Sequence, residues 1–269
     1  MILIGDCLSK LKEVPNESVQ TCVTSPPYWG LRDYDDSGQL GQEDHPEQFV
    51  SKLTEIFEEV RRVLKEDGTL WLNIGDTYFG AKGGHWDGGN SITNSDTGEK
   101  YREHRKAPPK HEYLKTKDLA GVPWLLAFSM QKKGWYLRQD IIWAKPNPMP
   151  EAVNDRCAKS HEHIFLFSKK KQYYFNADAI RINDVRRTSV WSMNTASCKE
   201  AHFAVFPEEL PALCIKAGSK EGDTVLDPFM GSGTTAYIAQ ELGREWIGIE
   251  LNPKYVEIIK RRTAQNTLF

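Results

Sequence analysis

A serine, two prolines and a tyrosine follow one another at Ser25, Pro26, Pro27 and Tyr28, directly after an apolar run. Consecutive prolines end a β-ladder and fix φ, so this segment forms a rigid corner whose proline nitrogens carry no N–H. The corner presents the Ser25 hydroxyl and the Pro26 carbonyl as hydrogen-bond acceptors, and Tyr28 adds a flat ring for stacking. We predict that it binds an aromatic amine and draws the nitrogen toward tetrahedral geometry for an in-line transfer.

A glycine-rich turn lies near the other end of the chain, where the sequence reads Asp-Pro-Phe-Met-Gly-Ser-Gly from Asp227. Gly231 and Gly233 have the spacing of a nucleotide-binding turn, because glycine permits the tight turn and lets a ligand approach the backbone. The next apolar strand ends at Glu250, an acid placed to accept both hydroxyls of a ribose. We therefore predict a cofactor site at this turn.

Three kinds of cofactor compete for the turn. A P-loop needs a lysine for the phosphates, and no lysine lies between Asp227 and Gln240. A nicotinamide dinucleotide would bring its pyrophosphate close to Asp227, where like charges repel. A sulfonium cofactor has no phosphate, and Asp227 would attract its cationic sulfur and amino group. The residues thus favour S-adenosylmethionine, and methyl transfer becomes the predicted chemistry.

Strands alternate with helices along most of the chain. Apolar runs predict strands at residues 1–4, 19–23, 69–74, 136–144, 164–168, 224–226 and 246–249, with a turn at Asp67-Gly68. Helical spacing predicts helices at residues 9–14, 46–64, 123–133, 208–217, 234–242 and 253–264. The alternation predicts an α/β fold with a doubly wound, mostly parallel sheet, and the two consecutive strands predict an edge hairpin. Such sheets bind ligands at the carboxyl ends of their strands, so the corner and the turn should line one rim.

The two motifs resemble those of the amino-methyltransferases of DNA, in the permuted arrangement called the β group, and the resemblance covers nearly the whole chain. In that family a Ser/Asp/Asn-Pro-Pro-Tyr/Phe motif precedes a Phe-x-Gly-x-Gly motif, and its Rossmann-like, circularly permuted fold places the two side by side. The resemblance implies that Ser25, Pro26, Pro27 and Tyr28 are catalytic. It implies cofactor binding by Asp6, Phe206, Asp227, Pro228, Phe229, Gly231, Gly233, Thr234, Thr235 and Glu250.

The base that would receive the methyl group is open between two amines. Serine at the first motif position leans toward N4 of cytosine in this family, and aspartate or asparagine leans toward N6 of adenine, so Ser25 favours cytosine. Methylation of a cytosine carbon would need a nucleophilic cysteine, commonly after a proline, and none of the five cysteines follows one. Because the amine is inaccessible in a stacked duplex, the base should flip into the site, with Tyr28 and Trp29 as stacking surfaces.

Other functions also fit a Pro-Pro-Tyr corner. Methylation of RNA or of a protein glutamine is one alternative, although glutamine-directed enzymes usually have asparagine where this chain has Ser25. A DNA-binding protein that keeps only cofactor affinity is the non-catalytic alternative. The presence of Ser25, Tyr28, Asp227 and Glu250 argues against such decay.

Length and charge set the expectations for domains and DNA contacts. A chain of 269 residues fits one catalytic domain, with a flexible basic insertion at 77–118 and a target-recognition region at 170–200. The net charge of −2 gives no global attraction to DNA, so phosphate contacts are expected from two local clusters. The clusters are Lys100, Arg102, Arg105, Lys106, Lys110, Lys115 and Lys117, and Lys169, Lys170, Lys171, Arg181, Arg186 and Arg187.

Cysteine use and apolar content indicate a soluble, intracellular protein, and the family resemblance implies a cytoplasmic enzyme, prokaryotic or phage-encoded, that acts on double-stranded DNA. The five cysteines are odd in number and widely spaced, which predicts free thiols. Cys157, His161 and His163 lack an evident fourth ligand, so no metal is expected. The sequence contains no run of about 18 apolar residues, so no membrane span is predicted. A cognate restriction endonuclease and a homodimer are partners that the sequence leaves open.

Overall fold

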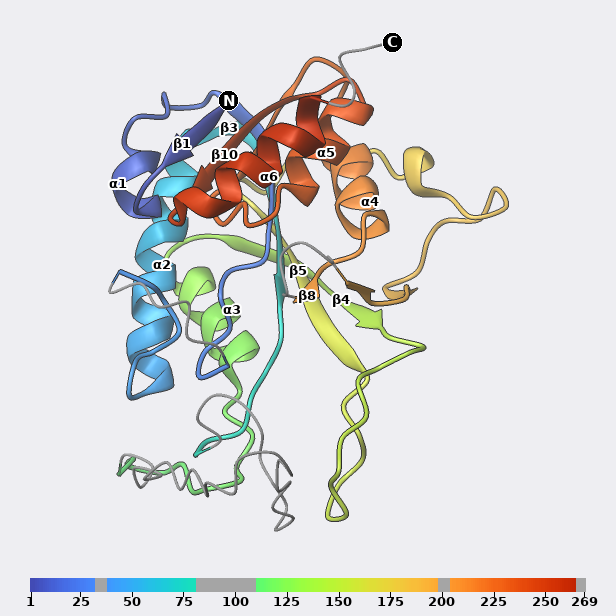
Figure 1. The fold of residues 1–269 in the computed structure, drawn as a ribbon. Helices are drawn as coiled ribbons and strands as arrows, with labels where there is room; N and C mark the ends of the chain where they lie inside the picture. Colours follow the sequence, from blue (N-terminus) through green and yellow to red (C-terminus); the bar gives the residue numbers. More distant parts are fainter. Residues whose placement is uncertain (32–37, 81–109, 198–203, 265–269) are drawn as a thin grey trace, which may run out of the picture.

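The computed structural model describes residues 1–31, 38–80, 110–197 and 204–264, and a twisted sheet runs through its centre (Figure 1). This sheet has eight strands in the order β1-β10-β9-β2-β3-β5-β4-β6. Its strands are β1 (Ile2–Ile4), β2 (Val19–Thr24), β3 (Leu64–Ile74), β4 (Tyr136–Ala144), β5 (His161–Ser168), β6 (Val190–Ser192), β9 (Thr224–Asp227) and β10 (Glu245–Glu250). The helices are α1 (Cys7–Leu11), α2 (Pro46–Val63), α3 (Val122–Lys132), η1 (Asp178–Ile180), α4 (Glu209–Gly218), α5 (Thr234–Glu241) and α6 (Pro253–Ala264). A separate two-stranded sheet pairs β7 (Ala196–Ser197) with β8 (Ala204–Val205).

The strand order reverses at β2, which confirms the predicted doubly wound architecture. From β2 the chain continues to β3 on one side, whereas β9, β10 and β1 lie on the other side. The pairing of β2 with β9 is parallel, with Thr21 opposite Val225 and Cys22 opposite Leu226. The carboxyl ends of these two strands therefore lie side by side at the position where open α/β sheets bind their ligands.

Strand β5 runs against its neighbours β3 and β4, and all other neighbouring strands of this sheet are parallel. His161, the first residue of β5, lies opposite Ala144, the last residue of β4. The amino end of β5 thus reaches the same rim as the carboxyl ends of the other strands. The predicted β4–β5 hairpin is present, but it is not the outermost pair, because Trp191 of β6 pairs with Trp143 of β4.

Three predicted boundaries need correction. Helix α1 begins at Cys7 rather than at residue 9, because the Asp6 side chain accepts a hydrogen bond from the Ser9 N–H (2.9 Å) and caps it. The predicted turn at Asp67-Gly68 lies inside β3, which already begins at Leu64, and the register of the β2–β3 pairing shifts between Leu64 and Thr69. Strand β5 begins at residue 161 rather than 164. Residues 81–109 of the predicted insertion and 198–200 of the predicted recognition region lie outside the described residues, and the division into these regions stays a prediction.

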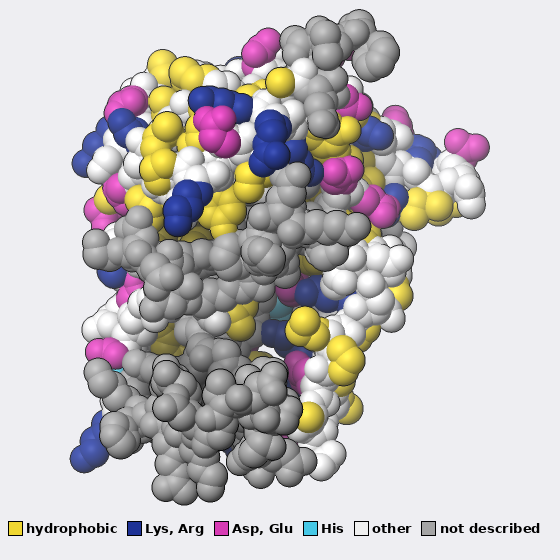
Figure 2. Space-filling view, viewed as in Figure 1, with side chains coloured by type: hydrophobic (Ala, Val, Ile, Leu, Met, Phe, Trp, Pro, Cys, Tyr) yellow, Lys and Arg dark blue, Asp and Glu magenta, His cyan; other side chains and the backbone are white. Residues whose placement is uncertain are grey.

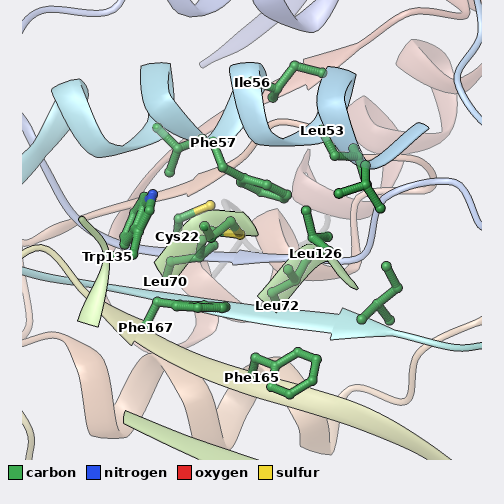
Figure 3. Close-up of a cluster of buried hydrophobic side chains, with 14 of the residues drawn as sticks. Cys22, Leu53, Ile56, Phe57, Leu70, Leu72, Leu126, Trp135, Phe165 and Phe167 are labelled. Atoms are coloured by element: carbon green, nitrogen blue, oxygen red, sulfur yellow. The ribbon is translucent and has the colours of Figure 1, made fainter. Parts of the chain in front are cut away.

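The sheet is covered on both faces, and its strands send alternate side chains to each face. Leu70 and Leu72 of β3 join the core beneath α1, α2 and α3, whereas Trp71 joins the core beneath α4 and α5. Figure 3 shows Leu53 and Phe57 of α2 directed toward this first core. Helix α2 has the apolar stripe that its sequence spacing predicts. Within the described ranges, each helix is too short or too polar to cross a bilayer.

The packing of α2 gives a stability prediction. Phe57 is fully buried, so Phe57→Ala should lower the free energy of unfolding by about 3–5 kcal/mol, through lost apolar burial and the cavity left behind. Glu55→Ala, an exposed position on the same helix, is the control and should change it by no more than about 0.5 kcal/mol. Urea unfolding of both variants measures the difference, and equal effects would contradict this account of the core.

Candidate active site

A cavity of about 340 Å³ lies where the two sequence motifs meet at the rim of the sheet. This volume falls within the range of about 300–1,000 Å³ that small-molecule sites occupy. Most of the residues that the sequence analysis assigns to a site line this cavity. They are Asp6, Ser25, Pro26, Pro27, Tyr28, Phe206, Asp227, Pro228, Phe229, Gly231, Thr234 and Glu250.

Asp227 joins the two motifs at the point where the strand order reverses. Its side chain is 1% exposed, and its Oδ1 accepts hydrogen bonds from the Thr24 hydroxyl (2.6 Å) and from the Phe229 N–H (3.0 Å). The Thr235 hydroxyl donates to Oδ2 at 2.7 Å. Burial raises the pKa of Asp227 to about 6, although these three donors act in the opposite direction. The last residue of β2 and the glycine turn are therefore held by one carboxyl group.

Two predicted cofactor residues, Gly233 and Thr235, are not among the described residues that line the cavity. The Thr235 hydroxyl is instead committed to Asp227. Gly233 adopts a left-handed φ of 84° at the start of α5, and a Cβ there would lie 3.0 Å from Cγ1 of Ile259. Both residues help to shape the turn, and direct cofactor contact by them stays a prediction.

Glu250 closes the glycine turn from the neighbouring strand. Its Oε2 accepts a hydrogen bond from the Gly231 N–H (2.8 Å), and its Oε1 accepts one from the Asn252 N–H (2.8 Å). Burial raises the pKa of Glu250 despite these donors. Each carboxylate oxygen has two lone pairs, so Glu250 can still accept hydrogen bonds from a ligand. Behind the turn, Arg262 of α6 donates to the Thr234 hydroxyl at 3.2 Å.

The corner after β2 is braced through Tyr28. The Tyr28 hydroxyl donates to Oε2 of Glu162 at 2.5 Å, and the Ser25 hydroxyl lies 3.5 Å from the Tyr28 oxygen, at the limit of a hydrogen bond. The Tyr28 ring packs against Gly75, where a Cβ would come within 2.7 Å of Tyr28 Cε2. With its own hydrogen directed at Tyr28, the Ser25 oxygen can accept a hydrogen bond from an amine.

Trp29 does not have the role that the sequence suggested. Its side chain is 7% exposed, its Nε1 donates to the Glu43 carbonyl (2.8 Å), and its ring stacks on Phe79. Trp29 therefore belongs to the hydrophobic core and does not form a stacking surface in the cavity.

The cavity wall includes side chains that the sequence analysis did not assign, among them Asn73, Trp143, Lys145 and Glu162. Asn73 lies near the end of a parallel strand, and Lys145 follows one directly, so their position at strand ends was a usable signal. Glu162 lies at the start of β5 and reaches the rim because that strand is antiparallel, which no local pattern indicates. Carboxylates thus surround the glycine turn, and a lysine–glutamate pair stands on the hairpin side.

Described lysines of both basic clusters pair with acidic side chains. Lys169 and Lys170 follow the carboxyl end of β5, which lies at the sheet edge opposite the rim, and both pair with Glu66. Lys117 pairs with Asp155 of the β4–β5 loop at 2.7 Å. Residues 100–106 of the first cluster lie outside the described residues. Over the described surface in Figure 2, Lys and Arg side chains mix with Asp and Glu side chains.

Comparison with known proteins finds relatives over nearly the whole chain. A sequence model of a family described as DNA methylase, for N6 and N4 enzymes, matches residues 19–261. The Type II methyltransferase M.SmaI of Serratia marcescens is 48% identical over 268 residues, which cover 97% of this chain and 89% of that protein.

Solved structures share the fold. The PvuII DNA methyltransferase, described as cytosine-N4-specific, superposes with a TM-score of 0.74 and 22% identity, over 100% of this chain and 87% of that one. A protein of Thermus thermophilus, named as a DNA modification methylase and complexed with S-adenosyl-L-methionine, gives a TM-score of 0.65. It is 25% identical, and the match covers 98% of this chain and 94% of that one.

The burial of Asp227 predicts a pH dependence of stability. Its pKa is about 6 in the folded protein and near 3.8 in an unfolded chain, so between these values the folded protein binds more protons. The free energy of unfolding should therefore fall as pH rises through this window, by about 1–3 kcal/mol relative to Asp227→Asn, which does not titrate. Urea unfolding of both proteins across the window provides the measurement. A difference that stays constant with pH would contradict the raised pKa.

Proposed function

Because the chain belongs to the DNA methylase family, we propose that it transfers a methyl group from S-adenosylmethionine to N4 of cytosine in DNA. One observation carries the proposal: the Ser-Pro-Pro-Tyr corner and the glycine turn line a single cavity and are bound to each other through Thr24 and Asp227. A methyl donor at the turn would thus face an amine at the corner, as in-line transfer requires.

The residues around the turn suit S-adenosylmethionine. Asp6, Asp227 and Glu250 bring three carboxyl groups to this half of the cavity, which favours a ligand with cationic groups and hydroxyls. Glu250 would accept hydrogen bonds from the ribose hydroxyls, and Phe229 would offer the adenine an apolar surface. When bound, the cofactor supplies an electrophilic methyl group.

The Ser25–Tyr28 corner would bind the target amine. The Ser25 oxygen and the Pro26 carbonyl would accept the two N–H bonds of the amine, which turns its lone pair out of conjugation with the ring. On accepting the methyl group, the nitrogen would have to release one proton. The Ser25 oxygen would receive this proton, and Tyr28 and Glu162 continue the hydrogen-bond chain behind Ser25. The catalytic assistance is mainly positioning and electrostatics.

The target base must leave the duplex, because its amine cannot otherwise reach a cavity at the rim of the sheet. Ser25 supports cytosine N4, and adenine N6 is the alternative target. RNA and protein glutamine are the competing substrates, and competition between DNA, RNA and protein would rank them. We further propose a cognate restriction endonuclease, since relatives are named Type II methyltransferases; a homodimer stays a prediction from the sequence.

Loss of the Ser25 acceptor tests the chemistry. Ser25→Ala should reduce methyl transfer to DNA about 100-fold, the scale for one lost transition-state hydrogen bond, while cofactor affinity stays unchanged. Ser18→Ala, which changes a serine before the opposite end of β2, should leave the rate unchanged. Mass spectrometry of digested DNA would measure the rate and distinguish N4-methylcytosine from N6-methyladenine. No methyl transfer by the unaltered protein, or equal rates for both variants, would refute the proposal.

Glu250 tests the cofactor site separately. Glu250→Ala should weaken S-adenosylmethionine binding about 10- to 100-fold, because hydrogen bonds to a charged group are lost. Glu245→Ala, at the exposed start of the same strand β10, provides the matched control. Isothermal titration calorimetry would measure both affinities. Unchanged binding in Glu250→Ala would remove this residue from the cofactor site.

A further inference from the structure

Three polar side chains line the cavity on the hairpin side, across from the glycine turn. They are Lys145 and Glu162 from the β4–β5 hairpin, and Asn73 from the end of β3. The Lys145 and Glu162 side chains are 17% and 11% exposed, so both are largely withdrawn from water although they carry formal charge. Withdrawing an ion pair from water costs free energy, because both charges lose their hydration. A functional role for this pair would explain its presence in the cavity.

Glu162 is held by three donors. Its Oε2 accepts from the Tyr28 hydroxyl (2.5 Å) and from Asn73 Nδ2 (3.1 Å), and its Oε1 accepts from the Lys145 ammonium. Because every partner donates, Glu162 acts here as an acceptor and as an anchor. It has no hydrogen to offer a base in this arrangement, so its effect on a base would pass through the residues that it holds.

Lys145 lines the cavity, and among these three side chains it is the one that keeps further N–H donors, because Asn73 Nδ2 donates to Glu162 and to the His163 carbonyl. An ammonium group has three N–H donors, and Glu162 is the side-chain acceptor that the described residues offer it. Its Nζ also lies 4.4 Å from the centre of the Trp143 ring, which is a cation–π contact. The lysine is therefore fixed in position with donors to spare.

We propose, on the basis of the proposed function, that Lys145 donates a hydrogen bond to O2 of the flipped cytosine and makes the site select cytosine over adenine. The amine lies at Ser25 on the β2 side, and the pairing edge of the base then extends across the cavity toward the hairpin. On cytosine this edge continues with N3 and O2, both acceptors. On adenine it continues with N1 and then a C–H group, which cannot accept from an ammonium. Lys145 is thus a specificity-determining residue, and Glu162 and Asn73 are positioning residues.

The test compares cytosine and adenine as targets. The natural target base is first identified from the methylated nucleosides. Two DNA duplexes are then made that differ only at the target position, with cytosine in one and adenine in the other. The value of kcat/KM is measured on each duplex. Lys145→Met should lower kcat/KM for cytosine about tenfold or more, the scale of one lost base contact, and leave the low rate on adenine unchanged or raised. The ratio of kcat/KM for cytosine to that for adenine should fall by at least the same factor, and cofactor affinity should not change.

Lys65→Met is the matched control. Lys65 forms the same kind of ion pair, with Asp223 at 2.8 Å, at the amino ends of β3 and β9, away from the cavity. Its removal should leave the base preference unchanged. A duplex with 2-thiocytosine, whose sulfur is a weak acceptor, gives a second measurement: it should slow the unaltered enzyme and make little difference to Lys145→Met.

The possible results distinguish a failure of the Lys145 role from a failure of the proposed methyl transfer. A preference in Lys145→Met within about twofold of the unaltered enzyme overturns the inference and leaves amine methylation intact. Methylation of adenine as the natural target has the same consequence. An unaltered protein that methylates no DNA overturns the proposed function and the inference together.

Discussion

The hydrogen bond from the Thr24 hydroxyl to Asp227 Oδ1 is the contact on which the site geometry depends. It joins the last residue of β2 to the last residue of β9, at the point where the strand order reverses. Burial of a carboxyl group is unfavourable, and three converging donors offset that cost only in part, as the raised pKa shows. The buried Asp227 carboxyl group holds the corner after β2 and the glycine turn together.

Close backbone approach refines the geometry on either side of this bond. A Cβ at Gly75 would strike the Tyr28 ring at 2.7 Å, and one at Gly248 would lie 2.4 Å from Cε of Met230 in the glycine turn. Each motif therefore packs against a glycine, Gly75 directly after β3 or Gly248 within β10, where a side chain would collide with it. Transfer between two bound groups is sensitive to displacements of about 1 Å, so packing of this kind matters for the rate.

The reversed strand β5 gives the cavity its two different ends. Because β5 is antiparallel, its first residues reach the rim, and Glu162 meets Tyr28 and Lys145 there. The glycine-turn end is lined by carboxyl groups, whereas the hairpin end has a lysine paired with a glutamate. This polarity suits a cationic methyl donor at one end and the acceptor edge of a base at the other.

The order of residues was enough to predict the α/β architecture, the corner at Ser25 and the turn at Gly231, because proline, glycine and apolar periodicity act on neighbouring residues. It also identified Glu250 from its place at a strand end. The bond from Thr24 to Asp227 and the reach of Glu162 to Tyr28 emerged only in three dimensions, since these contacts join residues far apart in the chain. The same holds for Trp29, which is core rather than a stacking surface, because exposure depends on what packs against the ring. Local patterns place each motif on its strand, and only the fold determines which side chains face one another across the rim.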